Sequence, residues 1–267
     1  MSEAGEKKIT IIVSIFIVHF IINLILYLSN GFNLDHTEDF YSVYSSVVII
    51  GYGLVALIFL FLISSRFGIR TYLGKVWFLF TLGILSFVFG DMIFSYYDIF
   101  LKTESPFPSI ADVVYLIGYP LIFIAIFTQI KSLNVKLPKN EIIVISAIQI
   151  FIALLVVMFL MIPMISTEIT HEFTIEMLLI SLAYVLFDLP LFLGALLLIF
   201  KYKGGQFSKV WLLVAIALIV MSFGDWLFAY YTWNGISLAW GIYDLFFIAL
   251  YQILIIVCIF LGKMVKQ

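Results

Sequence analysis

The sequence predicts an all-α integral membrane protein of eight transmembrane helices, built as two parallel four-helix repeats. Three observations lead to this prediction. Of the 267 residues, 64% are hydrophobic and only 11% are charged, whereas soluble domains carry about a quarter charged residues. Eight apolar runs have the length of a bilayer crossing, and one of them recurs in the second half of the chain. We therefore expect a lipid bilayer to surround this chain.

Each of the eight apolar runs is expected to form one membrane-crossing helix. The runs cover residues 9–28, 41–63, 76–97, 111–130, 142–162, 173–200, 210–231 and 240–261. A bilayer core about 30 Å thick needs roughly 20 helical residues, and backbone in lipid must satisfy its own hydrogen bonds. The first run is too long for a signal peptide and lacks a small-residue cleavage site, so we expect it to be retained.

The basic residues gather on one side of the predicted membrane. Thirteen of the 14 lie before the first run, after the last run or in every second loop, and only Lys102 lies on the other side. The positive-inside rule then places both termini in the cytoplasm, and we expect a multi-pass protein of a prokaryotic plasma membrane. No basic stripe predicts nucleic-acid binding. Trp77 and Trp211 are expected at the inner membrane interface.

An internal repeat relates the two halves of the chain. Residues 75–97 read KVWFLFTLGILSFVFGDMIFSYY and residues 209–231 read KVWLLVAIALIVMSFGDWLFAYY, with ten of 23 positions identical. Shared hydrophobicity alone would not align Lys, Trp, Gly, Asp and a Tyr-Tyr pair. The aligned acids are Asp91 and Asp225, each preceded by Phe-Gly.

The repeat also covers the spans that follow, where Asp112 aligns with Asp244 and Tyr119 aligns with Tyr251. With four spans in each copy, the copies should have the same orientation in the membrane. We therefore expect one membrane domain made of a first repeat, residues 1–134, and a second, residues 135–267.

Five aspartates are predicted to lie within or at the ends of the apolar runs. A charged side chain at bilayer depth costs about 2.5–3.5 kcal/mol, and no lysine or arginine lies within a run to pair with one. For Asp91 and Asp225 we favour a structural clamp, with a tyrosine hydroxyl or a helix N-terminus of the same repeat as donor. A ligand or proton site is the alternative. Asp112 and Asp244 are interpreted as helix caps, since Ser109-x-x-Asp112 forms a capping-box pattern.

Asp188 is the best candidate for a functional intramembrane acid. It is central in its run, has no counterpart in the first repeat and precedes Pro190, while Tyr184 lies one turn away. The predicted ligand-binding or proton site gathers these acids and the tyrosines near them: Asp188, Tyr184, Asp91, Asp225, Asp112, Asp244, Tyr119 and Tyr251.

Histidines and motifs add weaker signals. His36, His171 and Glu172 lie in equivalent outer loops and could bind a divalent cation, although solvated loop charges are the commoner explanation. His19 is interpreted as a partner in an interhelical hydrogen bond. The sequence contains no Walker loop, GxSxG elbow, HExxH or GxGxxG motif, so no catalytic residue and no cofactor are predicted.

Three segments resemble a known membrane module. GDMIFSYYDI, PFPSIADVVYLIGYPL and AYVLFDLPLFLGALLL are similar to segments of the eight-helix module found ahead of diguanylate cyclase, phosphodiesterase and histidine kinase domains in prokaryotes. The matching residues are Gly90, Asp91, Pro108, Ser109, Ala111, Asp112, Tyr115, Tyr119, Pro120, Tyr184 and Asp188. The resemblance covers most of the chain and is sharpest over about 30 residues around Asp112.

The resemblance implies a sensory or ligand-binding module with an outward-facing polar pocket. In that family an output domain follows the last span, but here the sequence ends at Gln267. We therefore expect signalling through a separate cytoplasmic protein or through a homo-oligomer. Two alternatives stay open: a small transporter or proton-coupled carrier using intramembrane aspartates, and an intramembrane lipid hydrolase, since the chain faintly resembles the eight-span lysoplasmalogenase family.

Overall fold

The computed structural model describes residues 3–30, 38–101, 107–168, 174–234 and 241–264, and in these it contains eight helices long and apolar enough to cross a membrane. The predicted all-α multi-pass architecture is therefore confirmed. In chain order the elements are α1 (Glu3–Asn30), α2 (Glu38–Phe67), α3 (Tyr72–Tyr96), η1 (Tyr97–Leu101), α4 (Ile110–Ser132), α5 (Lys139–Val156), η2 (Val157–Met161), α6 (Ile162–Ser166), α7 (Ile175–Lys201), α8 (Ser208–Trp233) and α9 (Ile242–Met264).

Two of the spans include a π-helical turn. η1 extends α3 at its end, and η2 joins α5 to α6 directly before Pro163. Proline also lies inside two other spans, as Pro120 in α4 and Pro190 in α7. Proline lacks the backbone N–H of a helical hydrogen bond, yet α4 and α7 continue as helices through Pro120 and Pro190.

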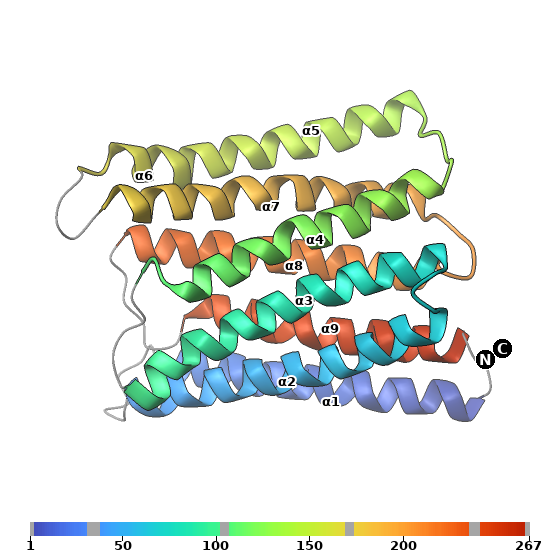
Figure 1. Cartoon of the computed structure of the whole chain (residues 1–267), viewed down its shortest axis with the longest axis horizontal. Helices are drawn as coiled ribbons and strands as arrows, with labels where there is room; N and C mark the ends of the chain where they lie inside the picture. The colour runs from blue at the N-terminus through green and yellow to red at the C-terminus, as the bar shows by residue number, and fades with distance from the viewer. Residues whose placement is uncertain (1–2, 31–37, 102–106, 169–173, 235–240, 265–267) are drawn as a thin grey trace.

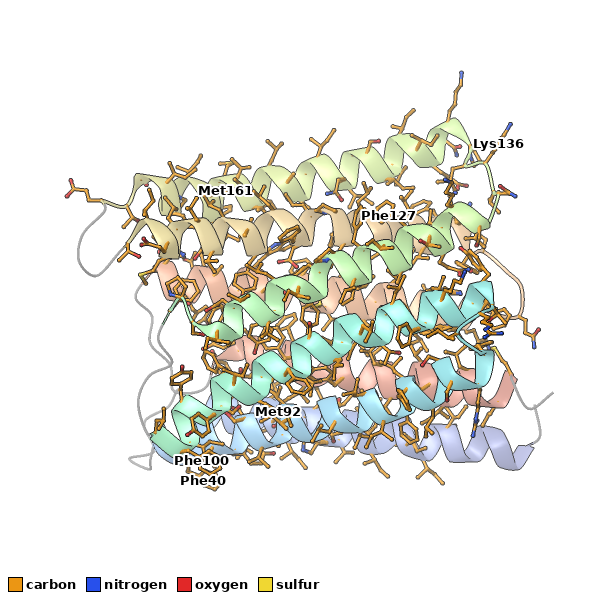
Figure 2. All side chains as sticks on the ribbon, in the orientation of Figure 1. Phe40, Met92, Phe100, Phe127, Lys136 and Met161 are labelled. Carbon is orange, nitrogen blue, oxygen red and sulfur yellow. The ribbon has the colours of Figure 1, made fainter. Side chains whose placement is uncertain are left out.

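The helices run side by side in one bundle, and both termini lie at the same end (Figure 1). Lys136, in the connection between α4 and α5, lies at that end, whereas Phe40 and Phe100 lie at the opposite end (Figure 2). This arrangement agrees with alternating crossings. Which end faces the cytoplasm stays a prediction from the charges.

The helix contacts fall into corresponding pairs. In each half the last two spans pack together, α3 on α4 and α8 on α9. Between the halves, α2 packs on α9 and α4 packs on α7. A parallel duplication would produce this pairing, but the duplication itself stays a prediction.

The first span of each half lies at the periphery and breaks the correspondence. α1 packs on α9, whereas α5 packs on α7. Only 6% of the α1 span and 11% of the α5 span are buried, against 56% of the α9 span. Both helices therefore present most of their surface to the surrounding lipid.

Trp77 and Trp211 lie in the core rather than at the lipid interface. Both side chains are buried, and their rings stack with centroids 5.0 Å apart. Tyr202 stacks on Trp211 at 5.9 Å, and its hydroxyl accepts a hydrogen bond of 2.6 Å from the Gln129 Nε2. The expectation of an interfacial belt was wrong for these two tryptophans, because sequence gives their depth in the membrane and not the face of the helix on which they lie.

A close approach of α3 and α4 depends on glycine. A Cβ on Gly118 would lie 2.6 Å from Phe87 Cε1 and 3.0 Å from the carbonyl oxygen of Gly83. The next residue along α4 is Tyr119, whose ring packs edge-on against Phe87 with centroids 5.2 Å apart. Gly118 therefore sets both the helix spacing and the position of Tyr119.

Replacing Gly118 by alanine should lower the free energy of unfolding by about 1–3 kcal/mol, the usual cost of overpacking. Thermal unfolding of the purified protein in detergent measures this change. Gly51→Ala is the matched control, since a Cβ there meets nothing within 4 Å and alanine favours helix. Equal effects of the two substitutions would contradict the close approach of α3 and α4.

Candidate functional site

Eight polar side chains form one acidic–aromatic cluster in the core of the bundle, contributed by α3, α4, α7, α8 and α9. Its members are Asp91, Asp112, Asp188, Asp225, Tyr115, Tyr119, Tyr184 and Tyr251. Seven of them were predicted as site residues, and Tyr115 was recognised only within the family motif. We call this set the acid cluster.

Asp91 on α3 is fully satisfied by two tyrosines. The Tyr115 hydroxyl donates to Oδ1 at 2.7 Å, and the Tyr251 hydroxyl donates to Oδ2 at 2.6 Å. Gly90 makes room for this arrangement, because a Cβ there would lie 2.6 Å from the Tyr115 ring at Cδ1. Asp91 therefore joins α3 to both α4 and α9, as expected of a structural clamp.

The tyrosine–aspartate bonds are exchanged between the two halves of the chain. Tyr119 on α4 donates to Asp225 Oδ2 on α8 at 2.9 Å, and the aligned Tyr251 on α9 donates to Asp91 on α3. We expected donors from the same repeat, which is right for Tyr115 and wrong for Tyr119 and Tyr251. The reason is that α4 and α9 each pack against a helix of the other half.

Asp112 caps α4 as predicted and also binds Tyr184. The Ser109 N–H donates to Asp112 Oδ2 at 2.6 Å, and the Ser109 hydroxyl oxygen accepts from the Ala111 N–H at 3.1 Å, which together make the capping box. The Tyr184 hydroxyl donates to Asp112 Oδ1 at 2.9 Å. Tyr184 thus links α7 to α4 through Asp112, although the sequence placed it beside Asp188.

Asp244 lies in the first turn of α9, in the position equivalent to Asp112 in α4. Its backbone N–H donates to the carbonyl oxygen of Gly241 at 3.0 Å. The predicted location at a helix start is therefore correct. None of the tyrosine–aspartate bonds of the acid cluster involves Asp244 among the described residues.

Asp188 differs from the other three acids of the cluster. It lies at the midpoint of α7, its side chain is 0% exposed, and neither carboxyl oxygen has a hydrogen-bond partner among the described residues. Asp225 and Ser222 of α8 adjoin its carboxyl group, at the margin of hydrogen-bond geometry. A buried acid without a donor is expensive and rare, which makes Asp188 the most unusual group of the described core.

Two buried polar residues of α8 were missed by sequence reasoning. Ser222 Oγ and Trp226 Nε1 are buried, and neither has a hydrogen-bond partner within the described part of the chain. Ser222 lies three residues before Asp225 and Trp226 directly follows it, so their proximity to the FGD motif was the available signal. Ser222 is the one of the two that adjoins Asp188 across the α7–α8 interface.

Tyr251→Phe should lower the free energy of unfolding by about 1.5–3 kcal/mol, because it removes a hydrogen bond to a carboxylate that links the two halves. Chemical or thermal unfolding in detergent measures the loss. Tyr96→Phe on α3 provides the control, since Tyr96 is exposed and its replacement should change stability little. If both variants unfolded like the wild type, the Asp91 clamp would not contribute to stability.

The remaining polar signals lie away from the acid cluster. His19 and Asn23 of α1 are hydrogen-bonded at 3.0 Å, and Gln252 of α9 approaches the His19 Nδ1 at 3.5 Å, as expected for an interhelical contact. His36, His171 and Glu172 lie outside the described residues. Across the part of the chain that is described, no group of three or more His, Cys, Asp or Glu side chains could hold a metal ion.

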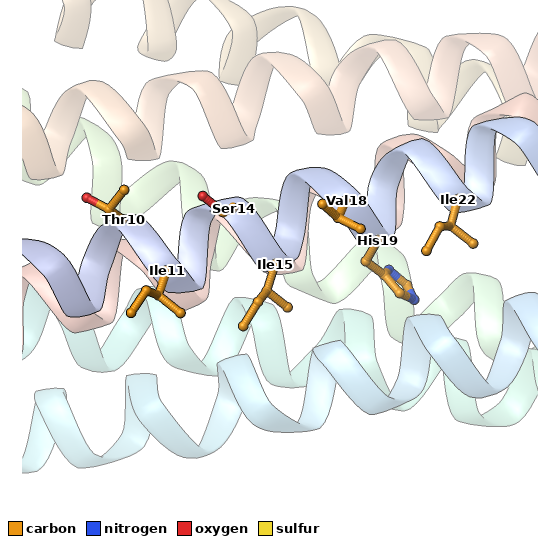
Figure 3. A pocket seen from close by; sticks show the side chains of 7 residues that line it. All are labelled: Thr10, Ile11, Ser14, Ile15, Val18, His19 and Ile22. Atoms are coloured by element: carbon orange, nitrogen blue, oxygen red, sulfur yellow. The ribbon is translucent and has the colours of Figure 1, made fainter.

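A surface groove of about 510 Å³ runs along α1 (Figure 3). Its lining comes from this one helix: Thr10, Ile11, Ser14, Ile15, Val18, His19 and Ile22. Apart from His19, which contacts α9 and the Tyr52 ring of α2, these side chains are exposed on a peripheral helix and mostly aliphatic. In a bilayer the groove would be filled by acyl chains, so it does not extend the acid cluster.

No family model, curated protein or solved structure matches this chain. The resemblance to the prokaryotic sensor module therefore rests on the residues quoted above and stays a prediction. Chemically, the acid cluster offers carboxyl oxygens whose tyrosine donors satisfy Asp91, Asp112 and part of Asp225. The unpartnered oxygens of Asp188 are the groups that the acid cluster can offer to a ligand.

Proposed function

We propose that this chain is a sensory module whose ligand-binding site is the acid cluster, and that it signals to a cytoplasmic protein. In this proposal it lies in a prokaryotic plasma membrane with both termini cytoplasmic. The observation that carries it is Asp188, whose two carboxyl oxygens are buried at the middle of a membrane helix without a donor among the described residues.

Asp188 lies where ligand binding could change how the helices pack. A ligand held by Asp188 on α7 would also meet Asp225 on α8, which Tyr119 ties to α4 in the other half. Because packed interfaces change between discrete arrangements, a ligand that prefers one arrangement would shift how the two halves pack. The inner ends of the helices would carry that shift to a partner.

Cross-linking in native membranes tests the proposed signalling. A photoreactive residue is placed at Lys136 or at Gly204, two exposed positions in the connections that share the end of the termini. Mass spectrometry should identify a protein with a cytoplasmic signalling domain, captured in different yield by the wild type and by Asp188→Asn. Capture of no such protein, or equal capture by both forms, would contradict the sensory function.

A small transporter or proton-coupled carrier is the second candidate, favoured by the prolines in the two helices beside the cluster. Pro120 follows Tyr119 directly, and Pro190 lies two residues after Asp188. Transporters place interrupted helices and unpaired acids at their binding sites. Proteoliposome uptake distinguishes the candidates: a carrier moves solute across the membrane and loses this activity in Asp188→Asn, whereas a sensor moves none.

A further inference from the structure

We infer that Asp188 and Asp225 hold one proton between them, resident on Asp188, and that this proton is the ligand of the module. The inference rests on the proposed sensory function for its biological meaning and deepens it by naming the ligand. Asp188 lies at the midpoint of α7, and the Asp225 and Ser222 side chains of α8 adjoin it. The two carboxyl groups therefore meet at the interface of two neighbouring helices.

The first support is the absence of positive charge where the two carboxyl groups meet. Two adjacent carboxylates disfavour each other's ionisation, and burial disfavours it further. No lysine or arginine lies within any apolar run. In α7 and in the helices packed on it, which are α4, α5 and α8, every lysine lies near a helix end: Lys131, Lys139, Lys201 and Lys209. The pair must therefore retain a proton.

The other titratable groups near the pair supply no positive charge either. They are phenols and acids of α3, α4 and α7: Tyr119, Tyr184, Asp112 and Asp91. The ionisable residues of α5 are Lys139 and Glu141, both at the start of that helix. Nothing in the described part of these helices replaces the proton as a partner for the second carboxyl group.

The second support is the unequal surroundings of the two carboxyl groups. Asp225 is partly exposed, and its Oδ2 accepts a hydrogen bond of 2.9 Å from the Tyr119 hydroxyl. Both features favour the charged form of Asp225. Asp188 is 0% exposed and has no donor among the described residues, which favours its neutral form. A protonated carboxyl group is itself a donor, which explains how Asp188 can be buried without one.

Loss of the proton would act on helix packing. The O–H bond of Asp188 would break, the proton would pass to water, and two carboxylates would remain at the α7–α8 interface. Their repulsion is strong in a core of low dielectric constant, so it favours an arrangement with the two helices further apart. Residues 202–207 connect α7 to α8 at the end of the bundle that holds the termini (Figure 1), where a partner could detect the change.

Infrared spectroscopy of the purified full-length protein in lipid nanodiscs tests the proton site, because a protonated carboxylic acid has a carbonyl band that a carboxylate lacks. At neutral pH the wild type should show such a band, which should disappear in Asp188→Asn and at alkaline pH. Asp91→Asn is the matched control and should keep the band, since two tyrosine donors favour Asp91 as a carboxylate. No band in the wild type, or an unchanged band in Asp188→Asn, would overturn the inference.

The pH dependence of unfolding provides a second measurement. An aspartate in the unfolded chain is ionised at neutral pH, so the folded protein binds one proton more than the unfolded chain. The folding equilibrium constant of the wild type should therefore fall about tenfold for each unit of rising pH, until the pair releases its proton. Asp188→Asn holds no such proton and should not show this fall. The same pH dependence in both proteins would contradict the proton site.

The two proposals fail separately. If cross-linking from Gly204 captures a signalling protein in a yield that depends on Asp188 but no protonated carboxyl group is found, only the identity of the ligand is wrong. If the proton is found and no signalling protein is captured, the sensory function is wrong while the proton site stands. A yield that changes with pH in the wild type and not in Asp188→Asn would support both.

Discussion

Asp188→Asn is expected to stabilise the folded protein by about 1–3 kcal/mol. The wild-type carboxyl is buried beside Asp225 without a donor among the described residues, and removing one partner of an unfavourable buried charge pair relieves its desolvation cost. Asparagine keeps the shape of the side chain and carries no charge. Residues that weaken the fold in this way are often kept for function.

Thermal unfolding in detergent measures this gain. Leu189→Ala, on the same helix, controls for local packing and should destabilise, as truncation of a partly buried aliphatic side chain does. A stability loss in Asp188→Asn would mean that the carboxyl of Asp188 has a structural partner after all.

Asp91→Ala is expected to destabilise the protein, in contrast to Asp188→Asn. It should lower the free energy of unfolding by about 3–5 kcal/mol. The substitution would leave the hydroxyls of Tyr115 and Tyr251 without their acceptor, and both rings sit in the core against α3. Removing the acceptor leaves two buried hydroxyl groups without a hydrogen bond. The free-energy cost of that is larger than the net stabilisation that the hydrogen bonds provide in the wild type.

A double-mutant cycle measures the interaction between Tyr251 and Asp91 within the clamp. Asp91→Asn combined with Tyr251→Phe should destabilise less than the sum of the two single variants, because both changes remove the same bond. Strict additivity would show that Tyr251 and Asp91 do not interact. Unfolding in the same detergent for all four proteins provides the comparison.

Local features of the fold were predictable from the sequence. The eight spans follow from apolar run length, and the capping box at Ser109 and Asp112 follows from a four-residue pattern. Asp91 and Asp225 bind tyrosine hydroxyls, one of the two kinds of donor that the sequence suggested.

The partners across the bundle were not predictable, because they depend on helix rotation and on contacts between segments far apart in the sequence. Tyr184 pairs with Asp112 and not Asp188, and Tyr119 and Tyr251 each bind an acid of the other half. Run length and spacing fix neither the rotation of α7 nor the packing of α4 on α7. Helix rotation also explains why Trp77 and Trp211 lie in the core and not at the lipid interface, where we expected them.

A high-resolution experimental structure of the wild type in lipid nanodiscs is the most direct test of the central claim that Asp188 is reserved for a ligand. The predicted result is an Asp188 carboxyl with no protein donor within about 3 Å. A side chain or backbone N–H that donates to Asp188 from anywhere in the protein would contradict the claim.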